Sequence, residues 1–197
     1  MYTPAHFRQT DRATIDTFIH DNGFGALISV VDGEVLASHL PFLYDAEQGL
    51  LLGHLARVNP QWKTLGGATD VRVILQGPHA YVSPTWYAKA SVPTWNYAAV
   101  HIRGRAEVFD EPQRLHALVE ALSCKHEAGS EAPWDGAYNR RMLEQIVGVS
   151  IRIEDIEATF KLSQNKSRAD RERVARELRR PAPSEAQRVA DLMDAQP

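Results

Sequence analysis

The sequence of 197 residues predicts an α+β fold built on a mostly antiparallel β-barrel with peripheral helices. Three observations lead to this class. Apolar runs of strand length recur along the chain, and one pair of them flanks a hairpin turn. Only a few helical segments lie between these runs, and they do not alternate regularly with them. The chain also contains no G-x-G-x-x-G and no P-loop sequence, so a Rossmann-type fold is disfavoured.

The first elements are a short helix and a hairpin. Residues Asp11 to Asn22 have an aspartate at the N-cap position, apolar residues on one face and Gly23 at the C-cap position. The strands Ala26 to Val31 and Glu34 to Leu40 then flank Asp32-Gly33, which is typical of a two-residue type I′ turn. A β-hairpin is therefore predicted here.

The strands that follow have the composition of a core. Leu50 to Ala56 and Val71 to Gln76 are apolar, and Ala98 to Val108 alternates strictly between small or apolar and polar residues. The last strand region, Val149 to Leu162, also alternates, but its phase slips at Glu154-Asp155. Such a slip predicts a β-bulge or a corner.

Two helices are expected between these last strands. The residues Asp110-Glu111-Pro112-Gln113 have the pattern of a capping box, and the apolar stripe behind it includes Leu115, Leu118 and Leu122. A second helix is predicted from Ala137 to Val147.

The composition changes after Gln164. Lys166 to Arg180 contains seven cations and three acids, a local charge of 7 − 3 = +4, and its pattern is that of a helix with a thin apolar stripe. Pro181-Ala182-Pro183 ends this helix before a short helical stretch. The sequence thus predicts a main domain over residues 1–165 and a C-terminal helical tail over residues 166–197.

Composition excludes several classes of protein. The chain has one cysteine, Cys124, which rules out an internal disulfide framework and argues against a cysteine metal site. Neither a leader-like N-terminus nor a run of about 20 apolar residues is present, so a soluble, cytoplasmic protein is expected. A net charge of −3 provides no overall attraction to nucleic acid.

The segment Gly77 to Tyr97 is the densest candidate site. Five of the chain's 16 aromatic residues lie between Tyr81 and Tyr97, among prolines and hydrogen-bonding groups. Flat rings beside polar side chains suit a planar ligand with polar edges. A structural loop whose tryptophans cap the core explains the composition equally well. The candidate ligand residues here are Ser83, Trp86, Tyr87, Thr94, Trp95 and Asn96.

Two further polar clusters lie at strand ends. In the first, His54 to Lys63, Arg57 could bind a phosphate through its planar fork and Lys63 could add charge. In the second, Phe160 to Asn165, an ammonium and two amides suit the polar edge of a ring cofactor. Solvated strand ends are the structural alternative for both, and Ser163 or Asn165 could instead cap the next helix. The candidates here are His54, Ala56, Arg57, Asn59, Trp62, Lys63, Lys161, Gln164 and Asn165.

Metal and hydrolase chemistry is not indicated. The eight histidines form neither H-x-H nor H-E-x-x-H, so no metal is predicted. No serine lies in a G-x-S-x-G elbow either, which argues against a nucleophilic hydrolase.

Ordered motifs along nearly the whole chain resemble the PaiB family, described as FMN-binding negative transcriptional regulators. The resemblance begins at Met1 to Phe7 and ends at Asp170-Arg171, with Thr85 and Val58 where serine and alanine are expected. Between these ends it is carried by Pro41 to Asp45, His54 to Trp62, Gly77 to Tyr87, Val92 to His101 and Lys161 to Asn165. No match extends beyond Pro181.

The resemblance implies a six-stranded split barrel like that of pyridoxamine-phosphate-oxidase-like flavoproteins. It further implies a homodimer that binds FMN at the subunit interface, with the three clusters above as contacts. Two functions follow: a regulatory flavoprotein, or an FMN-dependent oxidoreductase that takes electrons from a nicotinamide donor. DNA is a possible partner, although neither the net charge nor a helix-turn-helix supports it. The only local support is the cationic tail, which could contact phosphates through Arg171, Arg176, Arg179 and Arg180 or could instead be a solvated helix face. A haem-binding split barrel, with His54, His79 or His101 as axial ligand, is a third and weaker hypothesis.

Overall fold

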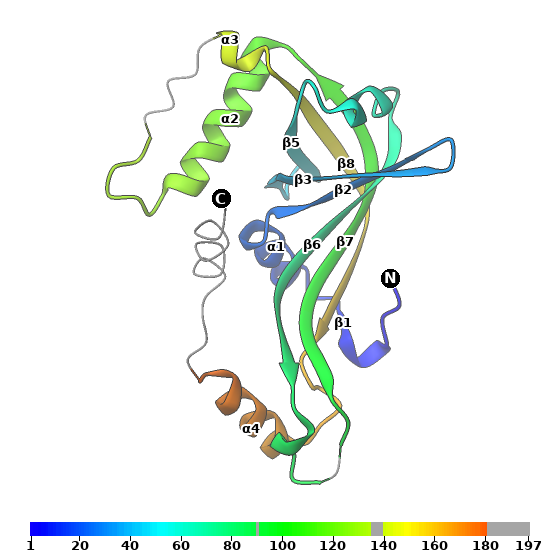
Figure 1. The fold of residues 1–197 in the computed structure, drawn as a ribbon, viewed down its shortest axis with the longest axis vertical. Helices are drawn as coiled ribbons and strands as arrows, with labels where there is room; N and C mark the ends of the chain where they lie inside the picture. Colours follow the sequence, from blue (N-terminus) through cyan, green and yellow to red (C-terminus); the bar gives the residue numbers. More distant parts are fainter. Residues whose placement is uncertain (90, 135–139, 181–197) are drawn as a thin grey trace, which may run out of the picture. The chain divides into compact units, whose positions relative to one another are not determined.

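The computed structural model describes residues 1–89, 91–134 and 140–180, and its elements are drawn in Figure 1. Among these residues it forms one sheet of eight strands, in the order β3-β2-β6-β7-β8-β5-β4 with β1 added to β8. Every strand pair whose register is resolved is antiparallel. The α+β class and the split-barrel architecture are confirmed, and the strand count is eight rather than six. The strands are β1 (Arg8–Gln9), β2 (Phe24–Val31), β3 (Glu34–Pro41), β4 (Leu43–Asp45), β5 (Leu50–Ala56), β6 (Thr69–Val82), β7 (Thr94–Phe109) and β8 (Ile146–Lys161).

Helices account for the remaining regular structure. The α-helices are α1 (Arg12–Asp21), α2 (Pro112–Glu127), α3 (Arg140–Leu143) and α4 (Arg168–Leu178), and the 3-10 turns are η1 (Ala5–Phe7), η2 (Pro60–Thr64) and η3 (Pro84–Trp86). No described helix combines the length and the apolar character that a membrane span requires.

Contacts divide the chain into two compact units. The first contains Met1–Pro78 and Tyr97–Leu162, and the second contains His79–Asn96 together with the chain from Ser163 onward. Helix α4 is therefore grouped with the ends of β6 and β7 instead of standing alone as a tail. The boundary between residues 165 and 166 remains a prediction.

The first helix and the hairpin form as the sequence predicts. Asp11 caps α1 by accepting a hydrogen bond from the Thr14 amide at 2.8 Å, although the C-cap is Asn22 rather than Gly23. In the turn between β2 and β3, Asp32 and Gly33 both have positive φ, 51° and 84°, as a type I′ turn requires.

The phase slip in the last strand is a β-bulge. Arg103 pairs with Asp155 and Gly104 with Ile153, so Glu154 is the extra residue of β8. Its carboxylate binds the guanidinium groups of Arg103 and Arg105. The bulge keeps Ile151 in the core while the residues beyond it resume the alternation.

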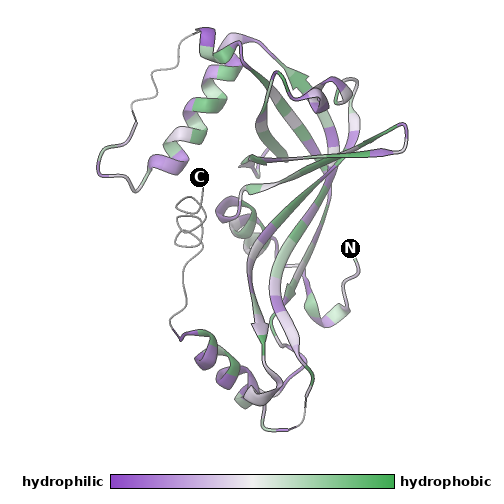
Figure 2. Ribbon diagram, in the orientation of Figure 1, coloured by the Kyte–Doolittle hydropathy of each residue, from purple (hydrophilic) through white to green (hydrophobic). Residues whose placement is uncertain are grey.

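The main core lies between the sheet and α1, and a second core lies under α2. Leu115, Leu118, Val119 and Leu122 of α2 are buried together with Phe109 and Leu143. Figure 2 shows the corresponding stripes of hydrophobic and hydrophilic residues along this helix. The prediction of a capping box at the start of α2 was wrong, because the N-cap is Glu111 and its side chain makes no capping hydrogen bond.

The predicted helix from Ala137 to Val147 was also wrong at its end. Ile146 and Val147 belong to β8, where they pair with Ala56 and Leu55 of β5. Within this predicted segment, the described helix is Arg140–Leu143, and residues 135–139 lie outside the described part of the chain. The predicted helix of the tail is present as α4, whereas the short stretch after Pro183 lies outside the described residues.

Candidate functional site

His54 lies near the end of β5 on the less buried face of the strand, which it shares with Leu52 and Ala56. Its neighbours Gly53 and Leu55 are buried in the core, whereas the His54 side chain is half-buried. Nδ1 of His54 is buried and has no hydrogen-bond partner among the described residues. Burial lowers the pKa of His54, so a neutral imidazole is favoured. A buried ring nitrogen without a partner can accept or donate a hydrogen bond to a ligand.

Arg57 directly follows Ala56, the last residue of β5, and is held by the chain at the start of β8. Its Nε donates to the Glu144 carbonyl at 2.9 Å and Nη2 donates to the Ile146 carbonyl at 3.1 Å. Nη1 lies 3.6 Å from a carboxylate oxygen of Asp110. The guanidinium therefore has a structural role, and binding of a phosphate by Arg57 remains a prediction.

The turn η2 positions Asn59, Trp62 and Lys63. Asn59 caps the turn by accepting from the Gln61 amide at 3.0 Å, and its own amide donates to the Ser38 hydroxyl at 2.8 Å. Trp62 donates from Nε1 to the Arg57 carbonyl at 2.9 Å. Lys63 is exposed, with Nζ 5.9 Å from the centre of the Trp62 ring. Lys63 is thus the more accessible cation of this segment.

In the second unit, the aromatic residues form an open surface. Trp95 is 55% exposed, and its ring centre lies 6.1 Å from those of His79 and Tyr81. Because His79 and Tyr81 are two residues apart on β6, they point to the same face of the strand. Tyr81 is also well exposed, at 46%. The period of two in β6 was the signal that could have added both residues to the candidates.

The turn η3 carries Ser83, Trp86 and Tyr87. Ser83 caps the turn, and its hydroxyl lies 2.8 Å from that of Thr85. Trp86 and Tyr87 are half-buried, and the Tyr87 hydroxyl is buried without a hydrogen-bond partner among the described residues. Lys166 lies over the Tyr87 ring, 4.8 Å from its centre. These contacts fasten η3 to the segment that leads into α4.

The loop after β8 contains the last candidates. Asn96, at the start of β7, is buried and hydrogen-bonded to Ser163, whereas Gln164 and Asn165 are exposed. Ser163 and Asn165 do not cap α4, because the N-cap is Ser167. Lys161 belongs to the first unit, where Nζ lies 5.7 Å from the centre of the Phe7 ring.

The candidates divide between the two units, and within the first unit Lys161 lies at the opposite end of the 16-residue strand β8 from Ile146, which pairs with Ala56. The first unit contains His54, Ala56, Arg57, Asn59, Trp62, Lys63 and Lys161. The second unit contains Ser83, Trp86, Tyr87, Thr94, Trp95, Asn96, Gln164 and Asn165. Within the described ranges, no group of three or more histidine, cysteine or acidic side chains could hold a metal ion.

The sequence and the fold were compared with known proteins. A family described as "Putative FMN-binding domain" matches residues 1–155. The chain belongs to this family. It is also 37% identical to the Bacillus subtilis protein named "Protease synthase and sporulation protein PAI 2", over 98% of this chain and 97% of that protein. The resemblance to the PaiB family is thereby confirmed. An uncharacterized protein of Emericella nidulans is 28% identical over 88% of each chain.

Solved structures with the same fold bind flavins. The FAD and heme binding protein from Mycobacterium smegmatis superposes with a TM-score of 0.65 at 15% identity, covering 93% of this chain and 79% of that chain. The flavocytochrome Anf3 from Azotobacter vinelandii superposes with a TM-score of 0.64 at 12% identity, covering 78% of this chain and 69% of that chain. At these identities the likeness establishes the fold alone. The solved structures thus support the split-barrel fold, whereas membership in the FMN-binding family rests on the match over residues 1–155.

Proposed function

We propose that this chain is an FMN-binding regulatory protein of the PaiB type. The observation that carries the proposal is the family match over residues 1–155, joined by similarity to PAI 2 over nearly the whole of both chains. The printed name of that relative associates it with sporulation.

The side chains of the first unit fit one part of a flavin mononucleotide. Lys63 is an exposed cation that can pair with the phosphate, and Arg57, whose Nη1 lies 3.6 Å from Asp110, can add positive charge beside it. The buried Nδ1 of His54 lacks a partner among the described residues and can hydrogen-bond the ligand. Lys161 lies at the opposite end of β8 from the residues that pair with His54 and Ala56, so in the proposed homodimer this ammonium comes from the partner subunit to the negative charge on the ring.

The side chains of the second unit fit a planar ring with polar edges. The exposed face of Trp95 offers a stacking surface, and Gln164 and Asn165 offer exposed amides. Ser83, Trp86, Tyr87 and Thr94 are its remaining candidate contacts. FMN supplies electron and hydride transfer when bound, whereas these side chains supply binding and orientation.

We further propose that the protein is a cytoplasmic homodimer, as the resemblance implies. Apolar exposure supports a contact between copies: Phe24, Val30 and Val35 of the β2–β3 hairpin are 63%, 59% and 67% exposed. Exposed apolar residues on adjacent strands are a common feature of interfaces. Analytical ultracentrifugation tests this, and Val30→Glu should dissociate the dimer while Val58→Glu, at an exposed valine elsewhere, should not.

A titration of apo-protein with FMN, riboflavin and FAD, followed by flavin fluorescence, tests the cofactor. Trp95→Ala should weaken the binding of FMN and of riboflavin to the same extent, because stacking involves the ring that both share. Lys89→Gln, at an exposed lysine of the same unit, serves as the control. A protein that binds no flavin, or that prefers FAD, would contradict the proposal.

The regulatory output needs its own assay. Two arginines on α4 and one just beyond it are engaged in local ion pairs: Arg168 with Glu172, Arg173 with Asp170, and Arg180 with Glu177. These pairs reduce the charge available for phosphates, so we do not assign DNA binding to α4. A gel shift with promoter DNA at two salt concentrations tests this, and sequence-specific binding at physiological salt would assign it.

An FMN-dependent oxidoreductase is the second candidate. The open aromatic surface of Trp95, Tyr81 and His79 favours it, because an exposed ring can stack on a planar electron donor. Oxidation of NADH or NADPH by the FMN-loaded protein would support this function. No turnover with either donor would leave the regulatory proposal.

A further inference from the structure

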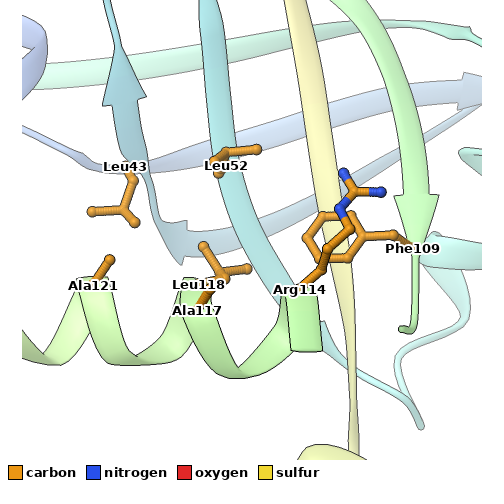
Figure 3. A pocket seen from close by; sticks show the side chains of 7 residues that line it. All are labelled: Leu43, Leu52, Phe109, Arg114, Ala117, Leu118 and Ala121. Carbon is orange, nitrogen blue, oxygen red and sulfur yellow. The ribbon is translucent and has the colours of Figure 1, made fainter. Parts of the chain in front are cut away.

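A pocket lies under the first turns of α2, at the edge of the second core. Its volume is about 250 Å³, and it is lined by Leu43, Leu52, Phe109, Arg114, Ala117, Leu118 and Ala121. Figure 3 shows the two leucines of β4 and β5 pointing toward the helix, with Arg114 beside Phe109. All of these residues belong to the first unit, and none is a candidate for the flavin.

The walls of the pocket are apolar and incompletely filled. Leu43 and Leu52 are half-buried and pack against the second core, and among the described residues no side chain covers them fully. Ala117 and Ala121 lie one helical turn apart on the same face of α2, and both are exposed. Two small side chains at these positions leave space that larger residues would fill.

Arg114 provides the one charge of the pocket lining. Its guanidinium lies 3.9 Å from the centre of the Phe109 ring, so the ring fixes the cation at the pocket. Its ion pair with Glu111 is long, 3.9 Å, between side chains that are 55% and 63% exposed. Such a pair contributes little, and the guanidinium can accept a second anion.

An apolar pocket with a cation at its wall fits a small amphipathic acid. A cavity of about 150 Å³ binds benzene, so this pocket has room for a ring with a short substituent. A carboxylate on that substituent can form a charge-assisted pair with Arg114. A protein partner would need about 800 Å² per side, far more than this lining of seven residues offers.

We propose that this pocket is an effector site for a small aromatic or branched aliphatic carboxylic acid. The proposal is independent of the flavin and assigns the protein a second ligand. For a regulatory protein, such a site provides an input in addition to the cofactor.

The experiment measures binding of phenylacetate to the purified full chain by titration in saturation-transfer NMR. Phenylacetamide has the same shape without the charge and is titrated in parallel. Arg114→Gln removes the cation, and Ala121→Leu fills the pocket with a residue that helices accept well. The matched controls on α4 are Arg168→Gln, an exposed arginine in an ion pair, and Ala169→Leu, an exposed alanine.

Phenylacetate should bind saturably, and Arg114→Gln should weaken it by about tenfold or more, as loss of a charged hydrogen bond predicts. Ala121→Leu should abolish binding, whereas both controls should bind like wild type. Phenylacetamide should bind wild type and Arg114→Gln equally. Circular dichroism establishes that both pocket variants fold.

Three results would overturn the proposal. Binding that survives in Ala121→Leu would place the acid elsewhere on the protein. The absence of saturation in the millimolar range would leave the pocket without this ligand. A change of oligomeric state in Ala121→Leu, measured by ultracentrifugation, would show that a second copy of the chain covers the pocket.

Discussion

Asn96 and Ser163 join the start of β7 to the loop after β8 through paired hydrogen bonds. The Asn96 amide donates to the Ser163 hydroxyl at 3.0 Å, and that hydroxyl lies 3.2 Å from the Asn96 amide oxygen as its donor. Both side chains are buried, at 8% and 5% exposure, and Ser163 has a φ of +64°. A residue predicted to face a ligand thus has its donor and its acceptor engaged within the protein.

We expect Asn96→Ala to destabilise the fold by about 1–3 kcal/mol, because it leaves the buried Ser163 hydroxyl unpaired. Urea unfolding of Asn96→Ala, Ser163→Ala and the double variant measures the coupling, which should be at least about 0.5 kcal/mol. Asn165→Ala, at an exposed amide in the same unit, is the control. Strictly additive losses would contradict this pairing.

Arg57 and Lys63 should respond differently to neutralisation. Arg57→Gln should lower the free energy of unfolding by about 1–3 kcal/mol, because the Glu144 and Ile146 carbonyls lose their charged donor. Lys63→Gln should change the free energy of unfolding by no more than about 0.5 kcal/mol, as exposed substitutions usually do. It should weaken the binding of FMN more than the binding of riboflavin. Flavin titrations and urea unfolding of both variants make the comparison. Equal losses for the two flavins in Lys63→Gln would place the phosphate elsewhere.

The stability of the protein should depend on the protonation of His54. Burial lowers its pKa below the ordinary value of 6.5, so below that pH the unfolded chain binds a proton that the folded chain does not. This contribution to stability is complete above pH 6.5. It is lost as the pH falls toward the lower pKa of the folded state.

Unfolding free energies measured across this pH range test the dependence. In His54→Gln the slope against pH should be shallower than in wild type by at most about 1.4 kcal/mol per pH unit, the value for one proton. Burial also lowers the pKa of His101, which contributes a slope of the same sign in both proteins. His126→Gln, at an exposed histidine, should reproduce the wild-type slope. A slope in His54→Gln equal to that of wild type would show that His54 does not cause this pH dependence.

Gly148 permits the ring of Phe109 to pack on β8. A Cβ at position 148 would lie 2.3 Å from two ring carbons of Phe109, with which Gly148 is paired in the sheet. We expect Gly148→Ala to destabilise by about 1–3 kcal/mol through overpacking. Because Phe109 forms a wall of the pocket under α2, the same substitution should also weaken the binding of phenylacetate. Gly129→Ala, where a Cβ meets nothing within 4 Å, is the control for thermal and urea unfolding.

Local patterns predicted much of the fold because they act over a few residues. The Asp32-Gly33 turn, the Asp11 cap and the phase slip at Glu154 all depend on the residues at those positions, and the structure contains each of them. The prediction that a helix extends to Val147 was wrong, because long-range pairing of this segment with β5 overrode the helical pattern. No local signal reports such a partner.

The sequence by itself determined the antiparallel barrel, its main turns, its family and the three segments that could bind a flavin. Only the tertiary structure decided what the side chains in those segments contact. It directed the guanidinium of Arg57 to backbone carbonyls, paired Asn96 with Ser163 and left the Trp95 ring exposed. The physical reason is that the polar groups of Arg57 and Asn96 pair with groups that folding brings beside them, and these partners are distant in sequence.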